Sequence, residues 1–159
     1  MPARLRIRPA RRADRVAVVG LLVAQFREHR IRLAPRALDR AVAGILAHPA
    51  RGRLILALVD RRTVGVAALG FTWPLEHGGR SAWLEELYVV PAARGRGIGT
   101  ALLRVACRLA ARCGAAAIDL EVDVRHRRAG RLYARAGFHR LPRTRWVRRL
   151  PRPRRGVGG

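Results

Sequence analysis

The sequence predicts one α/β domain over residues 1–150, in which a mixed β-sheet is flanked by about four helices. Three observations support this fold class. Apolar residues recur in the order strand, two helices, a meander of three strands, helix, strand, helix and strand. Half of the 159 residues are hydrophobic, which is enough for a single sizeable core. A glycine-rich turn joins the meander to the next helix, so the strands on either side of that helix should be parallel neighbours.

The first third of the chain predicts a strand and two helices. Residues 5–9 alternate and end at a proline, as in a short strand. Asp14 is suited to cap the helix that follows. Apolar side chains recur at helical spacing along this helix at Val16, Val19, Leu22, Val23 and Phe26. A second helix is expected to begin at Pro35, a residue favoured in the first helical turn, and to end before Pro49.

The centre of the chain predicts the meander. Residues 53–59 form a near-continuous apolar run, typical of a buried strand. A turn at residues 60–63 leads into a second strand, residues 64–73, and the two strands together make a hairpin. Residues 74–80 are expected to form a loop. The third strand, residues 82–90, runs directly into the glycine-rich segment.

The last third predicts two more helices and at least two strands. A helix covers residues 100–112, and residues 116–124 alternate between apolar and acidic, as in a strand. The next helix is expected over residues 127–136. Residues 138–150 should hold one or two closing strands. Residues 151–159 are basic and without an apolar pattern, which predicts a disordered tail.

The formal net charge of +24 comes entirely from arginine, because the chain has no lysine. Between Asp60 and Asp123 eight arginines are nearly balanced by seven acids, so the excess lies towards the two ends. We interpret the ends as solvated surface and do not expect a nucleic-acid partner, although a basic footprint is the alternative. No apolar run is long enough for a membrane span, and no signal peptide is recognisable. With two cysteines that are poorly placed to bridge each other, a cytoplasmic location is expected.

The segment from Arg94 to Gly99 is the candidate binding loop. Its three alternating glycines let the backbone approach a ligand closely. The following helix presents unpaired N–H groups that favour an anion. The loop is not a P-loop, which needs a lysine, and Thr100 breaks the glycine spacing of a dinucleotide fingerprint. From these residues alone, it is either a phosphate-binding loop or a tight turn between strand and helix.

Two segments carry a family resemblance. Residues 87–103 resemble the acetyl-CoA-binding motif of the GNAT superfamily of N-acyltransferases, whose Arg/Gln-x-x-Gly-x-Gly/Ala pattern is met by Arg94, Gly97 and Gly99. Residues 126–138 resemble the family's later Asn-x-x-Ala-x-x-Phe-Tyr-x-x-x-Gly-Phe segment. The order of elements agrees as well, so the resemblance covers most of the chain.

The resemblance implies a GNAT-like acyl-CoA N-acyltransferase fold with acetyl-CoA as the acyl-donor cosubstrate and no metal. Backbone N–H groups of the loop would hold the pyrophosphate of the cofactor. The residues that supply them are Arg94, Gly95, Arg96, Gly97, Ile98, Gly99 and Thr100. The pantetheine arm would bond to the free strand edge of Leu87, Tyr88 and Val89. His126 stands where the family usually has asparagine, and is a further candidate for a contact with the cofactor.

The resemblance also suggests catalytic residues. Tyr133 is the candidate general acid for the departing thiolate, with a core aromatic as the alternative. Residues 84–89 resemble a segment of polyamine-type N-acetyltransferases in which the first acid assists deprotonation through water, which points to Glu85 as the base. Glu86 is the second choice, because neighbours on a strand face opposite sides and only one should serve the substrate. Surface carboxylates, or a reaction without a protein base, are the alternatives.

Asp119, Glu121 and Asp123 form the other acidic row, which either pairs with arginines on a solvated or helix-covered face or lines the acceptor cleft. The histidines and cysteines offer no metal-ligand spacing. The sequence therefore predicts an acetyl-CoA-dependent N-acetyltransferase in which a primary amine, expected to be small, attacks the thioester directly. The alternatives are a non-catalytic acyl-CoA-binding or regulatory domain, or a protein or peptide N-acetyltransferase. The resemblance is also compatible with a homodimer.

Overall fold

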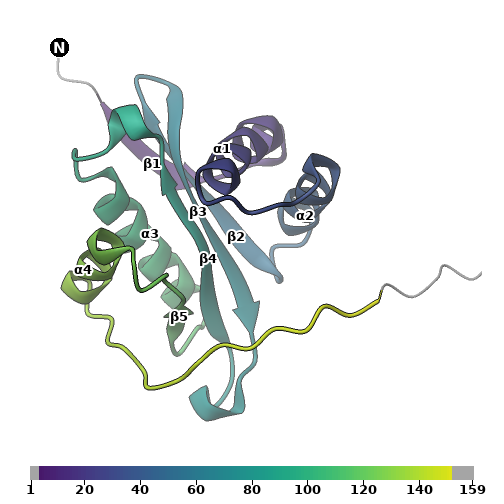
Figure 1. Ribbon diagram of the computed structural model, residues 1–159. Coiled ribbons are helices and arrows are strands. Elements are labelled where there is room, and N and C mark those ends of the chain that lie inside the picture. Colours follow the sequence, from purple (N-terminus) through teal and green to yellow (C-terminus); the bar gives the residue numbers. More distant parts are fainter. Residues whose placement is uncertain (1–3, 152–159) are drawn as a thin grey trace, which may run out of the picture.

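The structure, a computed structural model, describes residues 4–151 of the chain. Its strands form one sheet (Figure 1), in which the strand order is β1-β2-β3-β4-β5. The first four strands pair antiparallel, and β4 and β5 pair parallel. The strands are β1 (Leu5–Pro9), β2 (Gly52–Val59), β3 (Arg62–Thr72), β4 (Ser81–Val89) and β5 (Ile118–Leu120). The predicted mixed sheet is therefore confirmed, including the parallel pair on either side of the glycine-rich loop.

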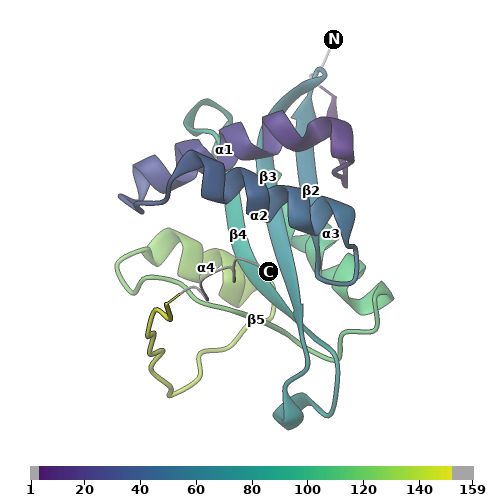
Figure 2. The ribbon, with the colours of Figure 1, turned by 90° about the vertical axis from the view of Figure 1, so that its right-hand side faces the viewer.

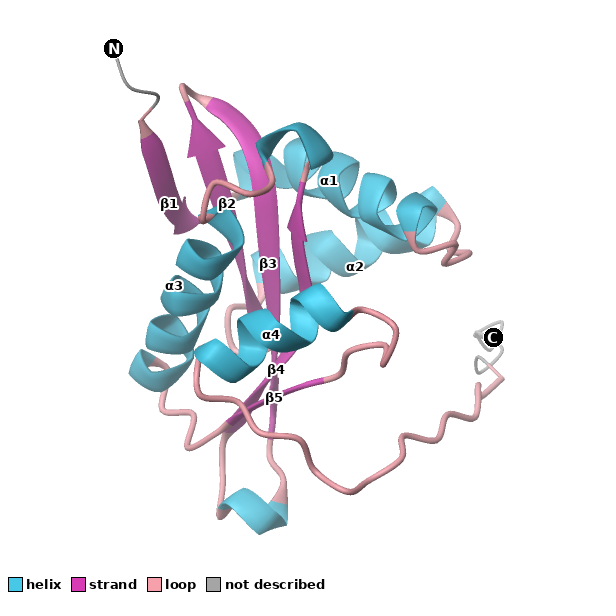
Figure 3. Cartoon of the chain, turned by 60° about the vertical axis from the view of Figure 1, so that its left-hand side comes forward, coloured by secondary structure: helices cyan, strands magenta, loops and turns pink. Residues whose placement is uncertain are grey.

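Within the described residues, four α-helices cover the two faces of the sheet. Helices α1 (Arg15–Glu28) and α2 (Pro35–Ala47) lie on one face (Figure 2), and α3 (Ile98–Arg112) and α4 (Arg127–Arg135) lie on the other (Figure 3). Short 3-10 turns are η1 (Arg12–Asp14), η2 (Leu75–His77) and η3 (Pro91–Ala93). No helix within residues 4–151 combines the length and the apolar character needed to cross a bilayer.

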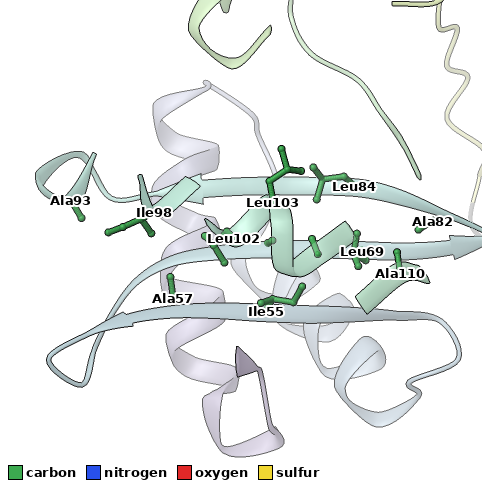
Figure 4. Close-up of a cluster of buried hydrophobic side chains, with 12 residues drawn as sticks. Ile55, Ala57, Leu69, Ala82, Leu84, Ala93, Ile98, Leu102, Leu103 and Ala110 are labelled. Atoms are coloured by element: carbon green, nitrogen blue, oxygen red, sulfur yellow. The ribbon is translucent and has the colours of Figure 1, made fainter. Parts of the chain in front are cut away.

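Each face of the sheet has its own hydrophobic core because the apolar run of β2 is buried on both sides. Leu54 and Leu56 pack against α1 and α2, and Ile55 and Ala57 face α3 (Figure 4). Burial of one such leucine or isoleucine side chain contributes about 1.5–3 kcal/mol. The sheet is thus held rigidly between two layers of helices, and its β4 edge becomes a fixed platform for the site.

Strands β4 and β5 separate soon after they pair. The parallel register joins Ala82 with Ile118 and Leu84 with Leu120, and no pairing continues beyond Leu84. The predicted strand over residues 116–124 is therefore too long. The chain leaves the sheet after Leu120, and the Asp123 carboxylate accepts a hydrogen bond from the backbone N–H of Arg125 (2.9 Å) in the turn that leads to α4. Residues 85–89 of β4 keep a free edge on this side.

A β-bulge interrupts β4 at Glu85. Leu69 of β3 pairs with Leu84, while Ala68 pairs with Glu86, so Glu85 has no partner of its own in the register. A bulge places one extra residue in a strand and shifts the side-chain alternation beyond it. The expectation that Glu85 and Glu86 face opposite sides of the sheet is wrong for this reason, as the side-chain contacts below show.

Three further sequence expectations are corrected. Residues 138–150 contain no strand: Pro142 and the clustered arginines break the apolar alternation, and Trp146 is 89% exposed. In the expected apolar row of α1, Val16 is exposed, whereas Leu22 is buried and Val19, Val23 and Phe26 pack against the core. Asp14 precedes α1 without a side-chain cap bond, since its carboxylate binds the Arg8 guanidinium (2.7 and 2.8 Å). The predicted tail lies, from residue 152, outside the described residues.

Candidate active site

The glycine-rich loop between β4 and α3 has the geometry of an anion cradle. Gly95 and Gly97 adopt φ angles of 76° and 74°, which side-chain-bearing residues rarely tolerate. A Cβ built on either glycine would meet nothing within 4 Å, so the loop faces open space. Ala101 is the first residue of α3 whose N–H bonds back, to the Gly97 carbonyl (3.0 Å). The N–H groups of residues 95–100 have no acceptor within the described chain and can hold a pyrophosphate.

Arg94 ties this loop to the first helix. Its guanidinium donates to the Glu28 carboxylate of α1 (2.8 Å) and to the Val89 carbonyl (2.9 Å), and lies over the Tyr88 ring. Its backbone N–H already bonds to the Pro91 carbonyl (3.2 Å) in η3. The free amides of the loop therefore begin at Gly95, and the Arg94 side chain, at the surface, ties the loop to α1 and β4.

Gly97→Ala is expected to weaken cofactor binding about tenfold, because a left-handed φ costs an alanine on the order of 1 kcal/mol or more. Isothermal titration of coenzyme A into the folded protein measures this affinity. Gly20→Ala is the matched control: Gly20 is an exposed glycine inside α1 with open space at its Cβ position. That change should leave binding unaltered and stabilise the helix by about 0.5–1 kcal/mol. Equal affinity of Gly97→Ala and the unchanged protein would contradict the cradle.

The free edge of β4 runs from the bulge to this loop. Leu87 and Val89 pack towards the α3 side of the sheet, and Tyr88 is buried among the side chains of the α1 and α2 layer. The three residues expected to line the pantetheine are thus anchored on both faces. Because their backbone on the β5 side has no strand partner, it is available to an extended ligand.

Glu86 projects from β4 into the layer of α1. Its Oε2 accepts a hydrogen bond of 2.6 Å from Nε2 of Gln25. Burial raises the pKa of the Glu86 carboxyl to about 7; the Gln25 hydrogen bond opposes this rise and the nearby charge of Glu85 adds to it. A carboxylate with a pKa near neutrality has the properties of a general base at physiological pH.

Glu85 lies on the same face as Glu86. A Cβ placed on Gly70 would come within 2.9 Å of Glu85 Oε1, and Gly70 shares its face of β3 with Ala68, which packs in the α1 and α2 layer. The Glu85 side chain reaches solvent, yet partial burial raises its pKa, against a lowering by the charge of Arg145. The bulge therefore gathers two carboxylates on one side of the sheet.

Tyr133 reaches the site from the opposite layer. It packs on the α3 side of the sheet, and its ring meets Phe138 edge-on with centroids 5.8 Å apart. Burial raises the pKa of the Tyr133 hydroxyl, and the charge of Glu86 raises it further. The hydroxyl therefore stays protonated at neutral pH, as a proton donor must. The effect of the Glu86 charge on its pKa also links the hydroxyl to the site at the free edge.

His126 precedes α4 and meets the first helix across the site. Its ring lies 5.1 Å, between centroids, from that of His29, which ends α1. The structure thus brings the C-terminal end of α1 close to the N-terminal end of α4. The role of His126 towards the cofactor stays a prediction.

The acidic row near β5 is engaged in pairs. Asp119 contacts the His77 ring (2.9 Å), and the Glu121 carboxylate accepts from Arg145 (2.6 Å). Asp123 pairs with Arg125 (2.6 Å). These contacts agree with the alternative in which the row pairs with basic side chains instead of lining the acceptor cleft. Within residues 4–151, no three His, Cys, Asp or Glu side chains come together as a metal site would require.

Gln25 is the site residue that sequence reasoning missed. The buried side of α1 consists of Val18, Leu21, Leu22 and Gln25, which is the spacing i, i+3, i+4, i+7 of a core-facing row. The signal in the sequence is a polar residue in the last position of an otherwise apolar row. It becomes visible only when the buried side of the helix is known.

The model of the acetyltransferase (GNAT) family matches residues 15–138. An aminoalkylphosphonate N-acetyltransferase of Salmonella typhimurium is 35% identical over 83 residues, which are 52% of this chain and 54% of that protein. A mycothiol acetyltransferase of Stackebrandtia nassauensis is 37% identical over 93 residues, which are 57% of this chain and 29% of that protein. The chain therefore spans about half or less of the length of these curated relatives.

Solved structures of similar fold cover nearly the whole chain. An integron cassette protein from the metagenome of Cole Harbour salt marsh has a TM-score of 0.82 at 28% identity, over 92% of this chain and 91% of that one. An aminoglycoside N-acetyltransferase in complex with CoA has a TM-score of 0.81 at 18% identity, over 94% of this chain and 97% of that one. The second likeness concerns the fold alone.

Proposed function

The chain belongs to the acetyltransferase (GNAT) family, and from this premise we propose that it is an acetyl-CoA-dependent N-acetyltransferase for a small cationic amine. The observation that carries the proposal is the arrangement around the free edge of β4. Glu86 lies on the α1 side of this edge, Tyr133 packs on the α3 side, and the glycine-rich loop follows at its end.

The cofactor supplies a thioester, whose C–S bond breaks as the amine forms a C–N bond with the acetyl carbon. The free amides of residues 95–100 would hold the pyrophosphate, and the edge of Leu87, Tyr88 and Val89 would hold the pantetheine. Glu86 takes a proton from the amine, directly or through water, because its pKa of about 7 leaves much of it ionised at neutral pH. Tyr133 gives its proton to the departing sulfur. This assignment places Glu86 ahead of Glu85 as the base, in the reverse of the order expected from the sequence.

The acceptor class follows from charge. Glu85 and Glu86 share one face of β4 because of the bulge, and two carboxylates together favour a cationic amine. The Arg145 guanidinium lies over the Trp83 ring and its charge acts on Glu85, but it is paired with the Glu121 carboxylate (2.6 Å), so it leaves the acidic character of this face in place. The activity named for the Salmonella relative involves an aminoalkylphosphonate, so an acceptor with a second, anionic group is included in the test.

The test is a screen of the full chain with acetyl-CoA, in which free thiol is measured over a panel of acceptors. The panel contains a diamine, a polyamine, an aminoglycoside, an aminoalkylphosphonate, a peptide with a free N-terminus and a peptide with an internal lysine. Turnover highest with a diamine or polyamine supports the proposal. Turnover confined to the peptides favours a peptide or protein acetyltransferase instead. Binding of coenzyme A without thiol release on any acceptor favours the non-catalytic alternative. The cytoplasmic location and the homodimer stay predictions.

A further inference from the structure

Gln25 occupies a position where a hydrophobic side chain would be expected. It continues the row of Val18, Leu21 and Leu22 on the buried side of α1, and only 4% of its surface is exposed. Its Nε2 donates to Glu86, but its Oε1 is buried and has no hydrogen-bond partner within the described residues. A buried acceptor without a partner lowers stability. The amide is therefore kept at this position at a cost to the fold.

We propose that Gln25 is a positioning residue, which holds the Glu86 carboxylate in place on β4 both before and after that carboxylate takes up a proton. The inference rests on the proposed function of Glu86 as the base. It adds a residue of α1 to the machinery, although the sequence motifs lie entirely between β4 and α4.

The chemistry of an amide explains the two roles. An ionised carboxylate only accepts hydrogen bonds, and Nε2 of Gln25 supplies one at 2.6 Å. A protonated carboxyl can donate, and a half-turn of the amide would present Oε1, the atom that now lacks a partner, to that proton. Glu86 can then keep one hydrogen bond to α1 in either state, so its carboxylate need not move as the amine is deprotonated.

The titratable and charged groups around Glu86 show how the Gln25 amide affects the pKa of Glu86. Glu85 lies next to Glu86 on β4, the charge of Glu86 acts on Tyr133 of α4, and the charge of Arg145 acts on Glu85. Of these influences, only the Gln25 hydrogen bond lowers the pKa of Glu86. The hydrogen bond to the ionised carboxylate is charge-assisted and therefore stronger than the one that the protonated carboxyl would make. Loss of the amide should therefore raise the pKa of Glu86 further, a change that a purely apolar packing role of Gln25 would not produce.

The experiment compares Gln25→Met, which keeps length and apolar bulk without a donor, with Leu22→Met on the same buried row. Carbon-13 NMR of the Glu86 carboxyl in the full chain, assigned through its loss in Glu86→Gln, reads the titration without requiring activity. We expect the midpoint to rise by about one pH unit in Gln25→Met and to stay unchanged in Leu22→Met. The acid limb of kcat/KM against pH should move by the same amount.

An unchanged Glu86 titration in Gln25→Met overturns the proposal whatever the activity. A shifted titration with an unmoved acid limb overturns it too, because Gln25 would then not act on catalysis. Lack of turnover on every acceptor, with the titration still shifted, would refute the proposed function while supporting the Gln25–Glu86 contact. Gln25→Leu repeats the measurement if the methionine variant does not fold.

Discussion

Glu86→Gln is expected to lower kcat/KM by about 10²- to 10⁴-fold at pH 8, the range that a positioned general base contributes. In the unchanged protein, kcat/KM should rise with pH up to about 7 and then level, since the pKa of Glu86 is raised to about 7. The variant should lose this limb, so that its kcat/KM depends on pH only through the ionisation of the amine substrate. Initial rates of thiol release between pH 5.5 and 9 measure both effects.

Glu85→Gln is the matched control for this prediction. Its carboxylate reaches solvent and has no hydrogen bond to α1, so the loss of activity should be smaller. Because the charge of Glu85 raises the pKa of Glu86, its removal should move the acid limb to lower pH. A larger loss in Glu85→Gln than in Glu86→Gln would restore the order of bases expected from the sequence.

Glu86→Gln should also stabilise the protein in alkaline solution. The folded pKa of Glu86, about 7, lies above its ordinary value, so the native state binds this proton more tightly than the unfolded state and stability falls as pH rises from about 4.5 to 7. Above pH 7 the ionised carboxylate costs about 3 kcal/mol. Glu86→Gln should recover much of this in urea unfolding at pH 8, and nothing at pH 4. A destabilised variant at pH 8 would mean that the buried charge is well compensated.

Local sequence was sufficient for the features that depend on local geometry. The glycine loop could be predicted because a left-handed Gly97 at the start of a helix is encoded within a few residues. A sheet flanked by helices could be predicted because β2 is apolar at every position from Leu54 to Val59 and must be covered on both faces. The family resemblance of the loop and of the segment around Tyr133 added the expected ligand class, which hydrophobic periodicity alone does not indicate.

Features that depend on pairing between distant residues could not be predicted. The bulge at Glu85 exists only in the register of β4 against Ala68 and Leu69 of β3, and no pattern within β4 marks it. Gln25 looks like an ordinary surface residue until the buried side of α1 is known. The closing strands failed for a related reason: residues 138–150 contain strand-forming residues such as Trp146 and Val147, but both are exposed and unpaired with the sheet.

Tyr133→Phe is expected to lower kcat by about 10²- to 10⁴-fold with the affinity for coenzyme A nearly unchanged. The phenyl ring can keep the edge-on contact with Phe138 and the packing against the α3 side of the sheet, so the loss should be confined to the proton that the hydroxyl gives. Stopped-flow or steady-state thiol release measures kcat, and calorimetric titration of coenzyme A measures binding in the same preparation.

Two further measurements distinguish a proton-donating role of Tyr133 from a role in packing alone. Burial and the charge of Glu86 both raise the pKa of Tyr133, so any basic limb due to its ionisation must lie above its ordinary value near 10, and the phenylalanine variant must lack it. Phe138→Leu provides the contrast, because it removes the ring that packs against Tyr133 while the hydroxyl remains. It should lower kcat less than Tyr133→Phe does. If Tyr133→Phe turns over at the unchanged rate, the thiolate leaves without a proton from this residue, and Tyr133 is a core aromatic whose hydroxyl has no part in the reaction.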